Sequence, residues 1–199
     1  MDPPNFELAR QVVLDRLARE LSPQLTYHSL AHTRDEVVPA ADRIAALEGL
    51  TGEDLMLLRT AAVFHDIGYV EQHHLHEEGS ARLAAAVLPQ FDYTPTQIAV
   101  IVDIILATQL PQVARTLPEQ ILADADLAIL GQTDYLLRNA ALRQELAALV
   151  KPATDQQWYG GQLNFIRNHR YFTRAARSLY EAQQQINVAA MAALLAQCE

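Results

Sequence analysis

The chain of 199 residues has little cysteine, few glycines and prolines, and no long apolar run. Its one cysteine, Cys198, cannot form an internal disulfide, which excludes a disulfide-stabilised scaffold and agrees with a reducing compartment. Seven glycines and nine prolines are too few for a collagen-like or low-complexity chain. The apolar runs are far shorter than the roughly 18 residues that span a bilayer, so no membrane helix is predicted.

Basic residues are also scarce. Fifteen Lys and Arg stand against 24 Asp and Glu, a formal charge of -9, which disfavours nonspecific binding of DNA or RNA but permits a small phosphorylated substrate. The first residues, MDPPNFELAR, do not resemble a secretory signal. We therefore expect a cytoplasmic protein that does not bind membranes, and a homo-oligomer remains open.

Helix-forming residues dominate the chain, and apolar residues recur every three or four positions, which predicts an all-α fold. We expect a helical core over residues 1–150 and, after the KPATD segment, a C-terminal helical extension over 151–199 that packs on the core. The last helix is expected to be interrupted. The predicted helices cover residues 5–21, 29–48, 53–66, 76–88, 95–109, 118–131, 133–149 and 155–196.

One segment is ambiguous. VIVDIIL, residues 100–106, reads either as a buried strand or as part of a helix that is buried nearly all round. Its length together with the flanking residues favours the helix.

The most informative motif is AAVFHDIGYV, residues 61–70. At about 100° per residue, Leu58, Ala62, His65 and Asp66 share one stripe of a helix, so the His-Asp pair faces the core. A buried carboxylate needs a compensating partner, and a divalent cation beside an imidazole is one. The alternative is a hydrogen-bonded His-Asp pair with a purely structural role.

A second carboxylate site follows in ILADADLAILG, residues 121–131. On a helical wheel Asp126 shares the apolar half with Leu122 and Leu130, whereas Asp124 lies across the helix. Asp126 is therefore the candidate ligand. We expect Asp124 to be solvated or to contact a metal ligand without binding the metal itself.

Two histidines in YHSLAHT, residues 27–33, complete a donor set. His28 and His32 are four positions apart and can share a site. A mixed set of imidazoles and carboxylates suits Mn, Mg, Fe, Co, Ni or catalytic Zn ions, one or two of them, with positions left open for water. The predicted metal ligands are His32, His65, Asp66 and Asp126.

The ordered set H…HD…D resembles the signature of the HD-domain superfamily of metal-dependent phosphohydrolases, which have an all-helical fold. The resemblance covers roughly residues 25–135. YHSLAHT is also similar to a segment of the distantly related cyclic nucleotide phosphodiesterases, and that resemblance implies that His28 is the general acid and His32 a ligand. The tail, WYGGQLNFIRNHRYFTRAARSL, resembles a bacterial group of predicted HD phosphohydrolases of undefined substrate.

The chain departs from other branches of this superfamily. The ppGpp hydrolases and HD-type 5'-deoxynucleotidases have a glutamate where this chain has Tyr69. HHLHEEGSA, residues 73–81, lacks the HHE and GYP motifs of the cyclic di-GMP branch. Pro111 stands where many group members carry a histidine. Those activities, and a second-metal histidine at position 111, lose support.

The resemblance also implies a mechanism. A divalent ion would lower the pKa of a coordinated water, which attacks phosphorus while His28 protonates the leaving group. Asp66 would bridge a second ion, if there is one. Glu77 resembles the glutamate that holds the attacking water, and His76 could approach a second ion. The alternative for both is that they lie outside the site: the macrodipole alone explains an acid in the first turn of a helix, and the neighbouring His73 and His74 are expected to be exposed loop residues.

Other charged residues near these motifs have weaker support. Arg34 could contact phosphate, and His169 could reach the site, although a core role is the usual one for such a histidine. Four arginines are expected on a solvated face of the C-terminal helix: Arg167, Arg170, Arg174 and Arg177.

The sequence thus favours an enzyme, a metal-dependent hydrolase of a phosphate ester of a nucleotide or another small phosphorylated metabolite. Its predicted catalytic residues are His28, Asp66 and Glu77. The alternative is a metal-containing module that senses a nucleotide or binds a partner with little or no turnover.

Overall fold

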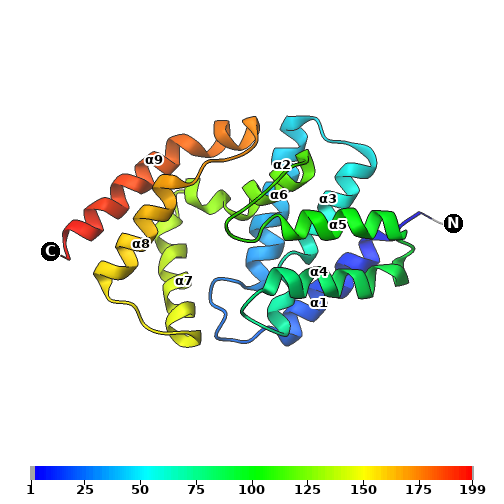
Figure 1. Ribbon diagram of the computed structural model, residues 1–199, viewed down its shortest axis with the longest axis horizontal. Helices are drawn as coiled ribbons and strands as arrows, with labels where there is room; N and C mark the ends of the chain where they lie inside the picture. Colours follow the sequence, from blue (N-terminus) through cyan, green and yellow to red (C-terminus); the bar gives the residue numbers. More distant parts are fainter. Residues whose placement is uncertain (1–2, 199) are drawn as a thin grey trace.

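The structure, a computed structural model, describes residues 3–198, so residues 1, 2 and 199 of the predicted domains lie outside it (Figure 1). Within this range all regular structure is helical, which confirms the predicted all-α class. No described helix is both long and apolar enough to cross a bilayer. The α-helices are α1 (Phe6–Glu20), α2 (Val38–Glu48), α3 (Gly52–Phe64), α4 (His76–Val87), α5 (Pro95–Leu106), α6 (Leu117–Asp126), α7 (Tyr135–Leu149), α8 (Asp155–Asn168) and α9 (Arg174–Ala196).

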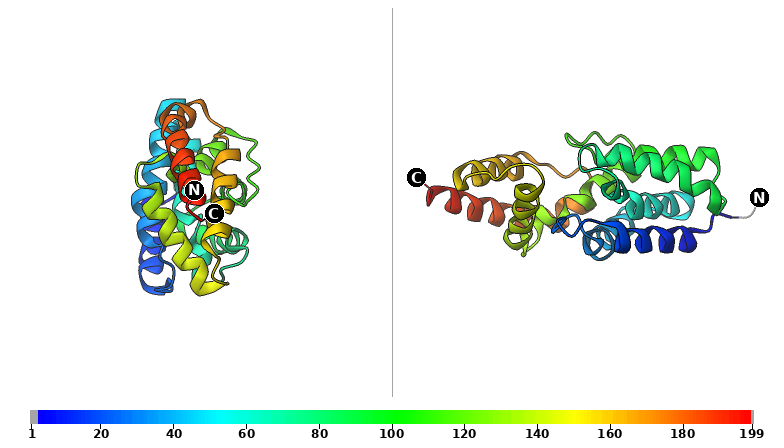
Figure 2. Two further views of the ribbon diagram at one scale, coloured as in Figure 1. Left: turned by 90° about the vertical axis from the view of Figure 1, so that its left-hand side faces the viewer. Right: turned by 90° about the horizontal axis from the view of Figure 1, so that it is seen from below.

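Helix α3 is the central helix of the main core, which α1–α6 largely form. It packs against α1, α2, α5 and α6, and its second half is buried on nearly every side. Ala61 and Ala62 are fully buried, and their small side chains let neighbouring helices approach closely. Two further views show an elongated molecule whose described ends lie far apart (Figure 2).

Several predicted helices end earlier than expected. Helix α3 stops at Phe64, so His65 and Asp66 follow the helix, and a 3₁₀ turn, η2 (Ile67–Val70), continues the chain. Helix α6 stops at Asp126 and is followed by a second 3₁₀ turn, η4 (Ala128–Gly131). The interruption expected in the last helix is present between Asn168 and Arg174.

The ambiguous segment at residues 100–106 belongs to helix α5, so the strand alternative is wrong. The helix is nevertheless not buried nearly all round. Ile101, Ile104 and Ile105 face the core, while Val100 and Asp103 are exposed. This apolar segment therefore belongs to a surface helix, and the face that carries Val100 and Asp103 is in contact with solvent.

A π-helical turn, η1 (His32–Val37), precedes α2 without a break. Pro39 has no backbone N–H and cannot bond to the carbonyl of Asp35, which disfavours a regular α-helical ladder at this point. The N–H of Val38 instead donates to the carbonyl of Thr33, five residues back. His32, whose side chain is buried, is the first residue of this wider turn.

Helices α7, α8 and α9 form a second, smaller apolar cluster. It contains Leu130, Tyr135, Leu163, Ile166 and Met191, whereas Tyr171 and Tyr180 join the main core. The boundary between residues 150 and 151 stays a prediction, and the apolar packing groups Tyr135 of α7 with the C-terminal helices.

Helix α9 crosses η4 at very short range. At Gly131 an added Cβ would overlap the backbone and Cβ of Tyr180, so only glycine allows this approach. Asn187 strengthens the crossing, because its side-chain amide donates to the carbonyls of Leu130 and Gln132. The C-terminal helices are thereby joined directly to the segment that follows Asp126.

Asp124 is fully buried, which corrects the expectation that it is solvated. Its carboxylate accepts hydrogen bonds from the backbone N–H groups of Phe172 and Thr173 and from the Thr173 hydroxyl, at 2.7–2.8 Å. Thr173 is also the N-cap of α9. Asp124 therefore fixes the start of α9 against α6 and has a structural role that its position on the helical wheel did not reveal.

We predict that Asp124→Ala lowers the free energy of unfolding by about 3 kcal/mol, because it leaves buried backbone N–H groups without acceptors. For a domain of this size that corresponds to a fall in Tm of about 5–10 °C. Urea unfolding and calorimetry provide the measurements. Asp103→Asn, an exposed acid in α5, is the control and should change little; equal stability of both variants would contradict the role assigned to Asp124.

Candidate metal centre

Three segments bring the four predicted ligands together. His32 begins the π-helical turn η1, His65 and Asp66 directly follow α3, and Asp126 is the last residue of α6. One donor atom from each of His32, His65 and Asp66 lies within 4.8 Å of the other two. These three residues are buried, with exposed fractions of 2%, 1% and 5%.

Donor distances around this point are those of a common coordination sphere. Asp66 Oδ2 lies 3.7 Å from His32 Nε2 and 3.3 Å from His65 Nε2. Asp126 Oδ1 lies 3.4 and 3.6 Å from the same two nitrogens. Neighbouring ligand atoms about 2.1 Å from one ion are about 3.0–3.4 Å apart, so only small movements are needed for all four to bind it.

Both imidazoles are oriented by a bond at the other ring nitrogen. His65 Nδ1 lies 2.8 Å from the carbonyl of Ala62, and His32 Nδ1 lies 3.1 Å from Glu36 Oε2. Because each acceptor takes the Nδ1 proton, each Nε2 is left as the metal-binding nitrogen. Arg138 of α7 donates to Glu36 at 2.7 Å and holds that carboxylate in place.

The atoms that point at the centre have no hydrogen-bond partner. His32 Nε2, His65 Nε2 and Asp66 Oδ2 are buried and form no hydrogen bond, although both nitrogens lie within ion-pair distance of the carboxylate oxygen. Buried polar atoms are normally satisfied, and an uncompensated carboxylate is costly. A divalent cation would satisfy all three, so the residues present fit the metal that the sequence predicts. Their role as ligands stays a prediction tested below.

The imidazoles and carboxylates of the centre shift one another's pKa values. Burial opposes protonation of His32, but Asp126, Glu36 and Asp66 outweigh it and raise the His32 pKa to about 9. The pKa of His65 is likewise raised by Asp66 and Asp126 against the effect of burial. Despite burial, the imidazoles hold the pKa values of Asp66 and Asp126 below the usual range. A cation must therefore displace protons from the imidazoles.

Asp66 also faces a second group of side chains. Its Oδ1 lies 3.4 Å from His76 Nε2, on the opposite side of the carboxylate from the predicted ligands. The buried Glu77 follows, with Oε2 3.5 Å from His76 Nδ1. His76 was only a weakly supported candidate in the sequence, and in the structure its imidazole lies beside Asp66. Asp66 has a backbone conformation of φ -109° and ψ 5°, in a sparsely populated region where active-site residues are often found.

Gly68 explains how His76 and Glu77 reach Asp66. A Cβ at Gly68 would overlap the backbone of His76 and Ser80, so the glycine lets η2 lie directly against the first turn of α4. The N–H of Gly68 donates to Ser80 Oγ at 2.8 Å. The glycine of the HDIG sequence is thus required for close packing of the two segments.

His28 lies beside the cluster in the loop before η1. Its ring stacks on Tyr69 at 4.4 Å, and Tyr69 stacks on His76 at 4.0 Å. The His28 ring centre is 5.8 Å from that of His32 and 5.9 Å from that of His76. Its Nδ1 lies 2.5 Å from Glu145 Oε1. The structure therefore places the predicted acid next to the predicted ligands.

Other sequence candidates lie elsewhere. Arg34 is exposed and forms two 2.8 Å bonds to Asp35. His169 packs against Phe165 and Tyr171, and burial, followed by the charge of Arg170, lowers its pKa to about 4. His169 therefore has the core role that was the alternative to a role in the site. The four arginines expected on a solvated face are exposed: Arg167, Arg170, Arg174 and Arg177.

Two supporting carboxylates were not found from the sequence. Glu36 is four residues after His32, so helical spacing could have pointed to it. Glu145 is 117 residues from His28 in the chain, and no local pattern links the two.

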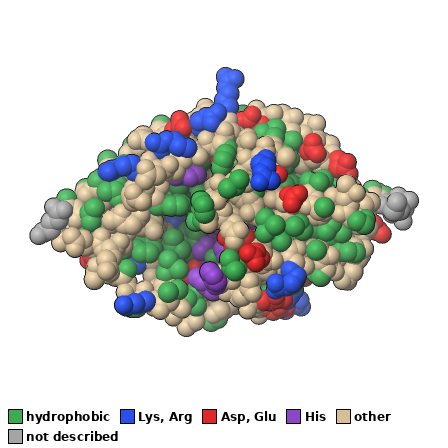
Figure 3. All heavy atoms as spheres, viewed as in Figure 1, with side chains coloured by type: hydrophobic (Ala, Val, Ile, Leu, Met, Phe, Trp, Pro, Cys, Tyr) green, Lys and Arg blue, Asp and Glu red, His purple; other side chains and the backbone are tan. Residues whose placement is uncertain are grey.

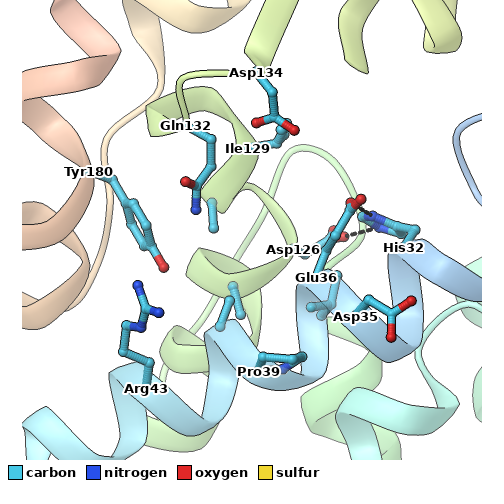
Figure 4. Close-up of a pocket in the computed structure, with 14 residues that line it drawn as sticks. His32, Asp35, Glu36, Pro39, Arg43, Asp126, Ile129, Gln132, Asp134 and Tyr180 are labelled. Atoms are coloured by element: carbon cyan, nitrogen blue, oxygen red, sulfur yellow. Dashed lines mark hydrogen bonds and ion pairs between the residues drawn. The ribbon is translucent and has the colours of Figure 1, made fainter. Parts of the chain in front are cut away.

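Among the four predicted ligands, only the side chain of Asp126 is partly exposed. Figure 3 shows a hollow in which histidine side chains lie among apolar walls. A separate pocket of about 230 Å³ borders His32 and Asp126, with Arg43 and Tyr180 at its other end (Figure 4). Neither His65 nor Asp66 lines this pocket, so it meets the cluster on one side only.

We predict that His32→Ala or Asp126→Ala lowers the bound metal to less than about a tenth of the wild-type content, because each removes a ligand from a sphere of four. Metal content is measured by mass spectrometry after loading with Mn²⁺ and desalting, and circular dichroism checks the fold. His74→Ala, an exposed histidine, should keep the wild-type content. A fully loaded His32→Ala protein would refute the assignment.

Metal affinity should rise with pH, by about tenfold per pH unit for each proton displaced. The pKa of His32 in the metal-free chain, about 9, lies above its ordinary value of about 6.5. Its contribution to the stability of the metal-free chain is therefore complete below about pH 6.5 and is lost as the pH rises through about 9. Calorimetric titration with Mn²⁺ at several pH values, with urea unfolding of EDTA-treated protein, tests both trends. An affinity independent of pH would contradict the account.

Comparisons with known proteins agree with this geometry. A model of the HD domain matches residues 16–128. The fold is similar to the crystal structure of a predicted HD superfamily hydrolase from an uncultured Thermotogales bacterium, with a TM-score of 0.65 and 20% identity over 98% of this chain and 94% of that chain. A search of curated proteins gave no match. Because the family model covers more than half of the chain, the chain belongs to the HD domain family.

Proposed function

We propose that the chain is a metal-dependent hydrolase of phosphate esters, with a nucleotide or another small phosphorylated metabolite as substrate. The observation that carries this proposal is the convergence of three buried donor atoms without hydrogen-bond partners: His32 Nε2, His65 Nε2 and Asp66 Oδ2. A purely structural His-Asp pair would use these atoms to satisfy one another. Membership of the HD domain family supports the same class of chemistry.

Four side chains would hold the ion: His32, His65, Asp66 and Asp126. A bound divalent cation supplies Lewis-acid chemistry, since it draws charge from the phosphoryl oxygens and activates water for attack. The remaining sphere of a six-coordinate ion would be open to water and substrate. The partly exposed side chain of Asp126 marks the accessible side of the cluster.

The neighbouring residues suit the proton transfers of hydrolysis. We assign Glu77 to accept a hydrogen bond from the attacking water, since it is buried one residue from His76 at the start of α4. We assign His28 to protonate the leaving oxygen, because its ring lies within 6 Å of the rings of His32 and His76. Tyr69, which stands in the place of a glutamate of other branches, stacks between His28 and His76.

A second ion has a natural place beside Asp66. The two oxygens of this carboxylate face different partners, Oδ2 toward His32 and His65 and Oδ1 toward His76. If a second ion binds, Asp66 and His76 would be the residues to hold it.

The substrate should be small. The chain carries a net charge of -9, and the groups around the centre are mostly acids and imidazoles. Such a site offers little attraction to a polyanion before metal is bound, so binding of the phosphate depends on the cation.

We predict that the protein hydrolyses phosphate esters only when metal is bound. EDTA-treated protein is tested against phosphomonoesters, cyclic nucleotides and nucleoside triphosphates, alone and with Mn²⁺, Mg²⁺ or Co²⁺, and bound metal is counted in the same samples. We expect turnover of at least one ester only with metal, and a loss of at least about 10³-fold in Asp66→Ala. His74→Ala should behave as wild type.

The opposite outcome would identify the alternative function. If no compound in the panel is hydrolysed by metal-loaded protein while a nucleotide raises its Tm, the chain is a sensing or partner-binding module. A variant without the ligands that remains active would exclude the proposed centre altogether.

A further inference from the structure

Helix α7 contributes a buried carboxylate to the surroundings of His28. Glu145 is fully buried and lies outside residues 16–128, the part that matches the HD domain model. Its Oε2 accepts the backbone N–H groups of Tyr27 and His28, at 2.8 and 3.0 Å. Its Oε1 lies 2.5 Å from His28 Nδ1. One carboxylate therefore binds both the backbone and the ring of the proposed acid.

The buried carboxylate of Glu145 is stable in its charged form only because it accepts hydrogen bonds from the two backbone N–H groups and from His28 Nδ1. Burial opposes its ionisation, but hydrogen bonds from His28 and from the two backbone N–H groups hold the pKa of Glu145 below its usual value. A charged carboxylate has no proton to give, so His28 Nδ1 must be the donor in this pair. The ring nitrogen that remains for a substrate is Nε2.

The ring is held from other sides as well. It stacks on Tyr69, and Tyr27 meets its face edge-on at 4.8 Å. With Nδ1 bound to Glu145, rotation of the ring would break a short charged hydrogen bond. The orientation of Nε2 is therefore fixed before substrate arrives.

We propose that Glu145 is the positioning residue of His28: its carboxylate accepts the hydrogen bond from Nδ1 and fixes the ring, so that Nε2 delivers a proton to the leaving oxygen. This inference rests on the proposed hydrolase function. In the reaction the bond from phosphorus to the ester oxygen breaks and a bond to the water oxygen forms. The ester oxygen takes the Nε2 proton, and the proton lost by water passes through Glu77 to solvent.

A merely structural role for Glu145 can be separated from this one. Helix α7 is tied to the same loop by other contacts: Thr26 Oγ1 donates to the carbonyl of Ala141 at 2.8 Å, and the Arg138 guanidinium lies 5.2 Å from the centre of the Tyr27 ring. These contacts do not involve Glu145. Glu145→Gln should therefore leave α7 in place.

The substitution should reverse the tautomer of His28. A glutamine has one acceptor oxygen and one donor NH₂ group. The backbone N–H groups of Tyr27 and His28 still donate to the oxygen of the glutamine side chain. Its NH₂ group therefore faces His28 Nδ1, which must accept a hydrogen bond from it. The ring then carries its proton on Nε2, and the doubly protonated ring is disfavoured.

Nitrogen-15 NMR of the full chain loaded with Mg²⁺ measures this directly, with the His28 signals identified by their absence in His28→Gln. We expect a proton on Nδ1 in the wild type and an unprotonated Nδ1 in Glu145→Gln. Gln144→Ala, an exposed neighbour on α7, is the control and should match the wild type. A wild-type Nδ1 without a proton, or no change in Glu145→Gln, would overturn the proposal.

Leaving-group dependence provides the kinetic test. An alkyl phosphate needs a proton on its leaving oxygen, whereas the 4-nitrophenolate of 4-nitrophenyl phosphate departs without one. We expect kcat in Glu145→Gln to fall about 10²-fold or more for the alkyl ester, the scale of general acid catalysis, and less than about threefold for the nitrophenyl ester. Equal losses for both esters, or loss of bound metal, would assign Glu145 a structural role and overturn the proposal.

The two measurements distinguish this inference from the proposed function. If the wild type hydrolyses none of these esters, the hydrolase proposal fails, and the catalytic half of the inference fails with it. The tautomer measurement still decides whether Glu145 controls the protonation of His28, because it requires no turnover.

Discussion

The structure depends on one electrostatic constraint: two imidazole nitrogens and a carboxylate oxygen meet inside the protein, and none of them has a hydrogen-bond partner. Apolar packing alone would not stabilise such an arrangement, because each group loses its hydration on burial. The surrounding fold is arranged to hold it. Glu36 and the Ala62 carbonyl orient the imidazoles, Gly68 brings the first turn of α4 against η2, and the buried His32 begins the π-helical turn.

The donor groups lie where regular helix ends or is distorted. His32 is in a π-helical turn, His65 and Asp66 follow the end of α3, and Asp126 is the last residue of α6. In mid-helix, side chains point in directions set by the helical repeat, whereas residues at ends can be aimed individually. The short central helix α3 and its small residues Ala61 and Ala62 allow these ends to approach one another.

Periodicity and residue type were sufficient to predict the all-α class and most of the helices, and apolar spacing on the wheel distinguished Asp126 from Asp124 as the residue that faces the other predicted ligands. The role of these residues as metal ligands stays a prediction. The same reasoning failed where the outcome depends on distant chain segments. Asp124 was expected to be solvated or to support a ligand, but residues 172 and 173 cover it and donate hydrogen bonds to it. The helix was expected to continue through Asp66, and its end at Phe64 has no proline or glycine signal. Glu145 could not be predicted, because its partner is 117 residues away.

Gly131 and Glu145 both join the C-terminal helices to the centre, the first by close contact with Tyr180 and the second by its bond to His28. All four donor residues precede Gly131 in the chain. In the proposed function, the residues that would hold a cation and the residue that orients His28 therefore lie in successive parts of one polypeptide. A change in the later part would alter the environment of His28 and leave the predicted ligands as they are.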